Sequence, residues 1–192
     1  MKTTLLFGLA ILLGILIAGC GGGDTVAAGR TGVPIVDTVL DAIEDADRDA
    51  LTPLWRLEDK ACIDPRSGPP AEVAGLCIEG EEPGTLIPTF RFTSCSGSAR
   101  GRANAEDLSD FILARDLSGV HAVFAATDEN AISANYRLIY GVAYDEEEPT
   151  NVLGYEVFLS EDQIVAIHVG CFLSPEALIE SLHPADRIPI SE

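Results

Sequence analysis

The strongest constraint on the fold is a series of strand-like runs near the end of the chain, joined by short polar links. The runs cover residues 120–126, 132–144, 152–159 and 164–172. In the second run, Tyr136, Leu138 and Tyr140 alternate with other residues, as expected of a strand that packs one face on a core. The links at 145–149 and 160–162 suit hairpins and are too short for parallel crossovers. The sequence therefore predicts an antiparallel sheet.

Two helical patterns come before these strand-like runs, and a third follows them. Pro34 suits the first turn of a helix, and apolar residues recur at three- and four-residue steps from position 36 to 55, with a break forced by Pro53. Asn104 is a capping signal for a middle helix, and Ser174 begins a last short one. Residues 85–95 form a further strand. We expect an α+β fold with the N-terminal helices packed on one face of a curved antiparallel sheet.

The first twenty residues predict export and lipid attachment. Lys2 precedes an uncharged, mostly aliphatic run at 5–18, which is too short to span a bilayer and has the length of a signal-peptide core. The tetrapeptide Ile-Ala-Gly-Cys that ends at Cys20 resembles the lipobox of bacterial lipoprotein precursors. That resemblance implies cleavage before Cys20 and a diacylglyceryl group on its sulfur. We expect a signal peptide at 1–19, a lipidated, Gly-rich tether at 20–32 and one domain at 33–192.

The charge of the chain excludes some partners. The 31 acidic and 12 basic residues give a net charge of −19, which opposes binding to nucleic acids and to anionic lipid headgroups. Membrane attachment is therefore expected through the lipid on Cys20 alone. The export signal places the protein in the bacterial cell envelope, outside the cytoplasm. The sequence contains no recognisable cofactor motif, and we expect no cofactor.

The predicted domain resembles the NTF2-like (cystatin-related) superfamily. The resemblance rests on the paired N-terminal helices with Ala46-Asp47-Arg48-Asp49-Ala50-Leu51 between them, where relatives often carry Gly-Asp-x-x-x-Leu, and on the terminal strands. The pattern of Cys, Gly and Pro at 61–85 is also similar to that of uncharacterised bacterial lipoproteins. The resemblance implies a cone-shaped sheet. Such scaffolds serve isomerases, dehydratases, transport factors and non-enzymatic binders alike, so the resemblance implies no single activity.

Four cysteines follow Cys20, and in an exported domain they predict two disulfides. We favour Cys62–Cys77 and Cys95–Cys171 among the three possible pairings. The gaps of 15, 18 and 76 residues between successive cysteines lack the close pairs of a zinc site, so no metal centre is predicted.

Candidate pocket residues come from the helices and the strands. His121 and His168 lie in strand runs and could face a cavity together with tyrosines or a carboxylate as acid–base groups. Aromatic side chains with polar tips are typical of pocket rims. The full candidate set is Trp55, His121, Tyr136, Tyr140, Glu156 and His168. A satisfied core role is the alternative reading for each of them.

No catalytic group can be assigned from spacing, so the sequence favours a lipid-anchored, non-catalytic domain that binds a small ligand or acts as an accessory protein. Two alternatives stay open. One is an isomerase or dehydratase of the NTF2-like type with a pocket histidine as base. The other is an envelope protein that docks a partner through an exposed apolar patch.

Overall fold

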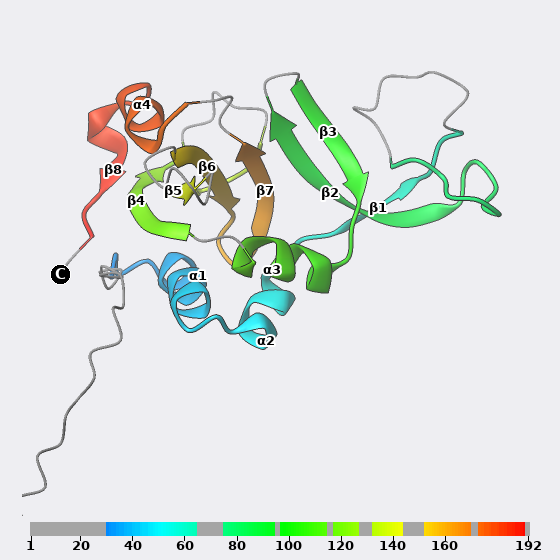
Figure 1. Ribbon diagram of the computed structural model, residues 1–192, viewed down its shortest axis with the longest axis horizontal. Coiled ribbons are helices and arrows are strands. Elements are labelled where there is room, and N and C mark those ends of the chain that lie inside the picture. The colour runs from blue at the N-terminus through cyan, green and yellow to red at the C-terminus, as the bar shows by residue number, and fades with distance from the viewer. Residues whose placement is uncertain are drawn as a thin grey trace, which may run out of the picture.

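An eight-stranded sheet is the centre of the computed structural model, which describes residues 30–64, 75–94, 97–114, 117–126, 132–143, 152–169 and 173–190 (Figure 1). The order of the strands is β1-β2-β7-β6-β5-β4-β8, and β3 also pairs with β2. Their bounds are β1 Glu58–Ala61, β2 Leu86–Ser94, β3 Gly97–Arg102, β4 Leu117–Ala125, β5 Tyr136–Ala143, β6 Val152–Leu159, β7 Ile164–Val169 and β8 Arg187–Ile188. The chain is thus a mixed α+β protein, as predicted.

Three helices lie together along one side of the sheet: α1 Pro34–Glu44, α2 Arg48–Leu51 and α3 Ala105–Leu113 (Figure 1). A short 3-10 turn, η1 Thr52–Leu54, follows α2 and contains the predicted break at Pro53. The main hydrophobic core lies between these helices and the sheet. It includes Val36, Val39, Leu40, Leu108, Val123, Leu138, Val157 and Ile167, all of which are buried.

The junction of α1 and α2 is a tight C-terminal turn of the first helix. The Ala46 and Asp47 amides donate to the carbonyls of Ile43 and Ala42, which is the Schellman pattern. Ala46 has φ +49°, in the left-handed region that favours glycine. Ala46 stands where the Gly-Asp-x-x-x-Leu pattern has glycine, and it is the residue with the left-handed backbone.

A fourth helix, α4 Pro175–Glu180, packs on the opposite face of the sheet, so the expectation that helices cover one face is incomplete. Leu178 forms a second core with Ala122, Phe124 and Ile139. The helix approaches β6 closely at Gly154, where an added Cβ would lie 2.3 Å from Leu178 Cδ1. Gly154 is thus required by the packing of α4. The 3-10 turn η2 Pro184–Asp186 then leads to β8.

Two features of the sheet differ from the prediction. The sheet is not wholly antiparallel, because β2 and β7 pair in parallel at Phe92–Ile167 and Thr93–His168. Strands β1 and β3 were not predicted, since neither has apolar alternation. Both form because β2 offers them antiparallel partners.

One disulfide, Cys62–Cys77, is present as favoured from the sequence. Cys20, the tether at 20–29, Cys95 and Cys171 lie outside the described residues. In the described part of the chain, no helix has the length and apolar character to span a membrane.

Candidate functional site

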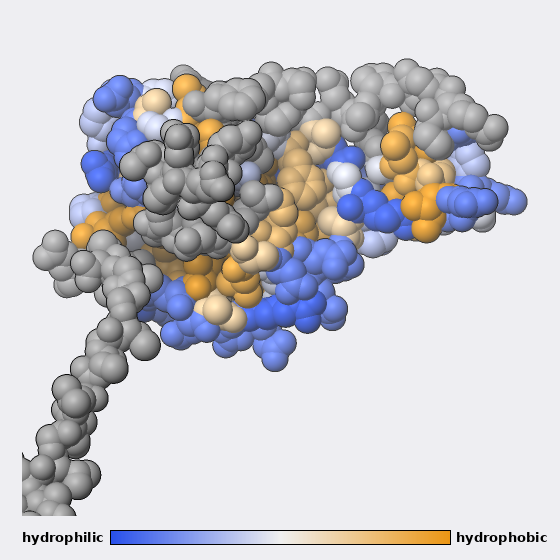
Figure 2. Space-filling model, in the orientation of Figure 1, coloured by the Kyte–Doolittle hydropathy of each residue, from blue (hydrophilic) through white to orange (hydrophobic). Residues whose placement is uncertain are grey.

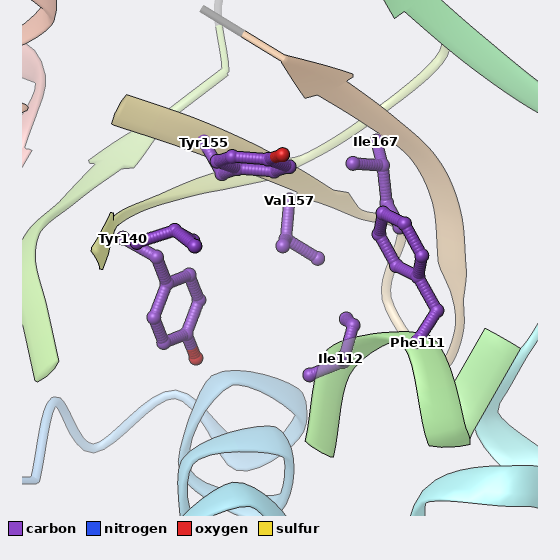
Figure 3. Close-up of a pocket in the computed structure, with 7 residues that line it drawn as sticks. Phe111, Ile112, Tyr140, Tyr155, Val157 and Ile167 are labelled. Carbon is purple, nitrogen blue, oxygen red and sulfur yellow. The ribbon is translucent and has the colours of Figure 1, made fainter. Parts of the chain in front are cut away.

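A pocket of about 290 Å³, part of it open to solvent, lies between α3 and the inner face of the sheet (Figure 3). Strands β5, β6 and β7 and helix α3 all contribute to its wall. The lining residues are Phe111, Ile112, Tyr140, Val142, Tyr155, Val157 and Ile167. Apart from two phenol groups, these side chains are hydrocarbon, so the pocket suits an apolar molecule.

The depth of the pocket follows from the burial of its wall. Ile112, Tyr140, Val157 and Ile167 are buried, whereas Phe111 and Tyr155 are half-buried. In Figure 3 the side chain of Val157 lies between the rings of Tyr140 and Phe111, with the ring of Tyr155 above it. The opening of the pocket is therefore on the side of Phe111 and Tyr155.

Tyr140 is the unusual member of this wall. Its side chain is only 2% exposed, and its hydroxyl has no hydrogen-bond partner in the described part of the protein. In Figure 3 the hydroxyl points toward α1, along the floor of the site. Burial raises the pKa of this phenol far above its ordinary value, and the Glu44 carboxylate adds to the rise. Tyr140 is therefore a neutral group and not a proton acceptor at physiological pH.

A row of aromatic rings sets the position of α3 over the pocket. Trp55 meets Phe90 edge-on at 5.2 Å between centroids, Phe90 meets Phe92 at 5.3 Å, and Phe92 meets Phe111 at 6.5 Å. Because Phe111 lines the pocket, this row connects the end of the N-terminal helices to the pocket wall.

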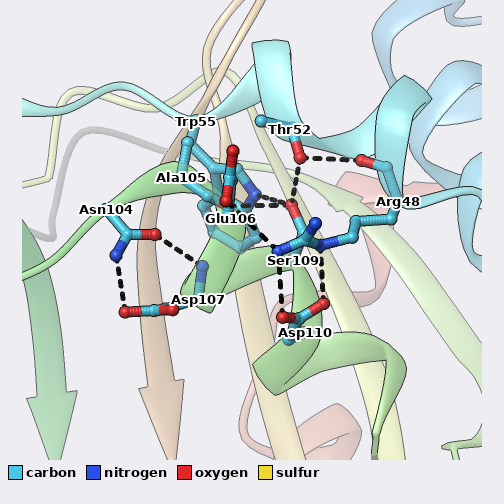
Figure 4. Close-up of polar contacts among 9 residues, drawn as sticks. All are labelled: Arg48, Thr52, Trp55, Asn104, Ala105, Glu106, Asp107, Ser109 and Asp110. Atoms are coloured by element: carbon cyan, nitrogen blue, oxygen red, sulfur yellow. Dashed lines mark hydrogen bonds and ion pairs between the residues drawn. The ribbon is translucent and has the colours of Figure 1, made fainter.

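Buried hydrogen bonds hold the other side of α3 (Figure 4). Ser109 is fully buried, accepts a 2.9 Å bond from Trp55 Nε1 and donates to the Ala105 carbonyl at 2.9 Å. Its hydroxyl also lies 3.1 Å from Thr52 Oγ1. Trp55, a candidate rim residue, is thus a buried core residue that orients α3 and does not line the pocket.

Surface groups add to the anchoring of α3. Arg48 of α2 forms an ion pair with Asp110, with 2.7 Å between Nε and Oδ1, and lies 3.4 Å from Glu106 (Figure 4). Asn104 caps the helix by accepting a hydrogen bond from the Asp107 amide. The exposure of these ion pairs limits their contribution to stability to about 1 kcal/mol or less.

His168 and Glu156 do come together, but on the other face of the sheet. They are paired residues of β6 and β7, and His168 Nδ1 contacts Glu156 Oε2. Glu156 Oε1 is 3.0 Å from Arg137 Nη1, and both side chains are nearly inaccessible. Arg137 also stacks over the ring of Phe158. Since alternate residues of a strand face opposite ways, Glu156 points away from the pocket that Tyr155 and Val157 line.

The remaining candidates are also apart from one another. His121 lies at an irregularity of β4, on the side of α4, with Nδ1 3.7 Å from Glu176 Oε1. Tyr136 is half-buried against the main core at the start of β5. Of the six candidate residues, Tyr140 alone lines the pocket.

Sequence reasoning missed six lining residues: Phe111, Ile112, Val142, Tyr155, Val157 and Ile167. A usable signal was present, because Val142 shares the alternation of Tyr140 in β5, and Val157 shares that of Tyr155 in β6. The contribution of α3 depends on where the helix crosses the sheet, which no local pattern specifies.

The described residues offer one cluster of metal-ligating types, Cys62, Cys77 and Glu81. The two cysteine sulfurs are joined to each other, and Glu81 is hydrogen-bonded to the Ile78 amide and paired with Arg102. These groups therefore serve the local structure.

Comparison with models of protein families and with curated proteins gives no match. Among solved structures, the chain is similar to an NTF2-like protein of unknown function from Cytophaga hutchinsonii. The identity is 12%, the alignment covers 76% of this chain and 91% of the other, and the TM-score is 0.35. A superposition this loose transfers neither a ligand nor an activity.

Proposed function

We propose that the protein is a lipid-anchored, extracytoplasmic binding protein whose NTF2-like domain holds a small apolar molecule between α3 and the sheet. The observation that carries the binding function is the pocket itself, with a wall of aliphatic and aromatic side chains contributed by four elements. Concave apolar sites of this kind are the usual form of small-molecule sites in proteins.

The size of the pocket limits the ligand. An enclosed apolar cavity of about 150 Å³ accommodates benzene. The pocket here reaches about 290 Å³ only when the space open to solvent is counted, so its enclosed part is smaller than that cavity. The ligand is therefore a small apolar group, no larger than a single ring, that lies partly in the open side of the pocket.

The position of the ionisable groups favours binding over catalysis. Among the described residues that line the pocket there is no His, Asp or Glu, and Tyr140 is held neutral. An isomerase with a pocket histidine needs its base within hydrogen-bond reach of the ligand. His168 and Glu156 face the other way, so a ligand in the pocket does not meet them.

Two sequence features and one structural feature support the location. The lipobox-like tetrapeptide provides the anchor at Cys20, and the signal-peptide core provides export. The Cys62–Cys77 disulfide is typical of proteins outside the cytoplasm. Two or more acyl chains give stable attachment where one is marginal.

Ligand-observed NMR on the full-length chain in detergent tests the binding function, with benzene as the probe. We expect saturation transfer to the probe and shifts of the Ile112 and Ile167 methyl signals. Val157→Phe places a ring in the pocket and should abolish both effects. Val152→Phe, the same change at a half-buried position of β6 outside the pocket, should leave them intact. Binding that is equal in both variants would refute the pocket as the site.

Mass spectrometry of the protein from its native membrane tests the anchor. We expect an N-terminus at Cys20 that carries acyl groups, and loss of membrane association in Cys20→Ser. An unmodified Cys20 sulfur in the mature protein would contradict this part of the proposal.

A further inference from the structure

An extended arm projects from the body of the protein beyond the helices (Figure 1). The arm consists of β1 with residues 62–64, the segment 75–85 and the beginning of β2. Leu76, Ile78 and Leu86 on this arm are 51%, 58% and 68% exposed, and together they define the arm patch. In Figure 2 an orange area lies on the arm, with hydrophilic residues beyond it at the tip. Large exposed apolar groups gathered in one place indicate an interaction site.

Strand pairing explains why Leu76 and Leu86 point outward. Ala61 pairs with Leu86, and Ile63 pairs with Leu76, so all four share the outer side of the arm. The inner side is occupied by Ile87, which is 2% exposed and lies so close to Gly75 that a Cβ there would be 2.8 Å from it. The inner side of the arm is therefore fully packed, and Leu76 and Leu86 on its outer side remain exposed to solvent.

Covalent and turn constraints hold the arm patch in a fixed form. The Cys62–Cys77 disulfide ties segment 75–78 to the end of β1. Two successive turns follow, closed by the bonds Glu81 N–H to Ile78 O and Thr85 N–H to Glu82 O. Their third residues, Gly80 and Gly84, have φ +91° and +98°, as type II turns require. A surface that is ordered before binding loses little entropy when a partner docks.

The charges around the arm patch are negative. Lys60 and Arg100 share the carboxylate of Glu58, and Arg102 is paired with Glu81, so each of these cations has an acidic partner. The carboxylates of Asp59, Glu79 and Glu82 are exposed and form no ion pair with any described residue. The chain as a whole carries −19. This field repels a second copy and an anionic membrane, and it attracts a basic surface.

We propose that the arm patch docks another protein through a surface that has apolar side chains at its centre and Lys or Arg around them. Leu76, Ile78 and Leu86 bury apolar area against the partner, and Asp59, Glu79 and Glu82 select the basic rim. The docking site is separate from the pocket, so it remains testable if the pocket binds nothing.

Fluorescence anisotropy with synthetic peptides on the full-length protein tests this proposal. The probe is a short leucine/lysine peptide, with leucine/glutamate and serine/lysine peptides as its counterparts. We expect the leucine/lysine peptide to bind at least about tenfold more tightly than either counterpart. Replacing the three arm-patch residues by serine should remove this preference. Leu173→Ser, at an exposed leucine outside the arm, should not.

A second variant tests the rim while keeping the apolar centre. Glu79→Lys with Glu82→Lys should weaken the leucine/lysine peptide and strengthen the leucine/glutamate peptide, and both effects should shrink at high salt. Equal binding of all peptides, or no effect of either variant, would overturn the proposal. Self-association of the unmodified protein that the serine variant abolishes would overturn it as well, because the occupant would then be a second copy.

Discussion

Tyr140→Phe should stabilise the protein, contrary to most substitutions in a core. The Tyr140 hydroxyl is buried and has no hydrogen-bond partner in the described structure, which costs about 1–3 kcal/mol relative to a satisfied or solvated group. Phenylalanine keeps the ring and removes the hydroxyl, and the lost dispersion contacts of one oxygen are each about 0.1–0.2 kcal/mol. We expect the free energy of unfolding to rise by about 1–2 kcal/mol. For a chain of this size, the melting temperature should rise by about 2–4 °C per kcal/mol.

Urea unfolding followed by circular dichroism measures this change, with Tyr136→Phe as the matched control. Tyr136 lies on the same strand and face but is half-buried, so water reaches it and the expected change is within about 0.5 kcal/mol. Destabilisation by Tyr140→Phe of about 1 kcal/mol or more would refute the reasoning, because it would mean that the hydroxyl has a partner in solution.

The same group gives a pH signature with a defined sign. Burial and the Glu44 carboxylate raise the pKa of Tyr140 in the folded state, while the unfolded phenol titrates at its ordinary pKa of 10.0. Above pH 10 the unfolded state loses a proton that the folded state keeps, so the contribution of Tyr140 to stability falls as pH rises. Tyr140→Phe should remove this part of the alkaline decline, and Tyr136→Phe should not.

Three other substitutions have predictable results in the same unfolding assay or in hydrogen exchange. Ala46→Gly should raise the free energy of unfolding by about 0.5–1 kcal/mol. An alanine in the left-handed region costs about 1–3 kcal/mol, and part of the gain from relieving this strain is lost because glycine loses more backbone entropy on folding. Gly154→Ala should destabilise by about 1–3 kcal/mol by displacing α4, whereas Gly101→Ala, with its nearest contact at 3.8 Å, should be neutral. The Ile78 amide lowers the pKa of Glu81, and Arg102 lowers it further, so this turn should loosen as pH falls below the usual glutamate pKa of 4.5, and the protection of its amides relative to the unfolded chain should decrease. Glu81→Gln should show the looser turn already at neutral pH.

Local sequence patterns predicted the elements whose apolar periodicity matches the face that they bury. Helix α1 begins at Pro34 as expected, and β6 has the predicted bounds of 152 and 159. Apolar periodicity decided both, because each element buries one face on the main core. The Cys62–Cys77 disulfide followed from its short loop and its Pro- and Gly-rich surroundings.

Elements that depend on distant partners were missed. Strand β3 has the sequence Gly-Ser-Ala-Arg-Gly-Arg, which has low strand propensity, and it forms because the edge of β2 is available to it. The parallel pairing of β2 with β7 joins residues more than seventy positions apart, and no hairpin rule predicts it. The same limit explains the candidate site: the pairing of Glu156 with His168 follows from register, and the crossing of α3 over the pocket follows from the aromatic row.

The division of the sheet into two faces also sets how tightly the proposed site can bind. The pocket face lacks charged groups among its described lining residues, while on the other face Glu156 pairs with Arg137 and contacts His168. Affinity must then come from apolar burial. Burial supplies about 0.8 kcal/mol per CH₂ group, and the cost of association offsets much of the sum, so we expect dissociation constants weaker than about 1 mM. The proposed lipid anchor would shorten the path between the pocket and apolar molecules dissolved in the membrane, and so would speed loading of the pocket without changing its affinity. On this reasoning, Cys20→Ser should slow transfer of a probe from membranes to the protein while leaving the affinity and the equilibrium occupancy of the pocket unchanged.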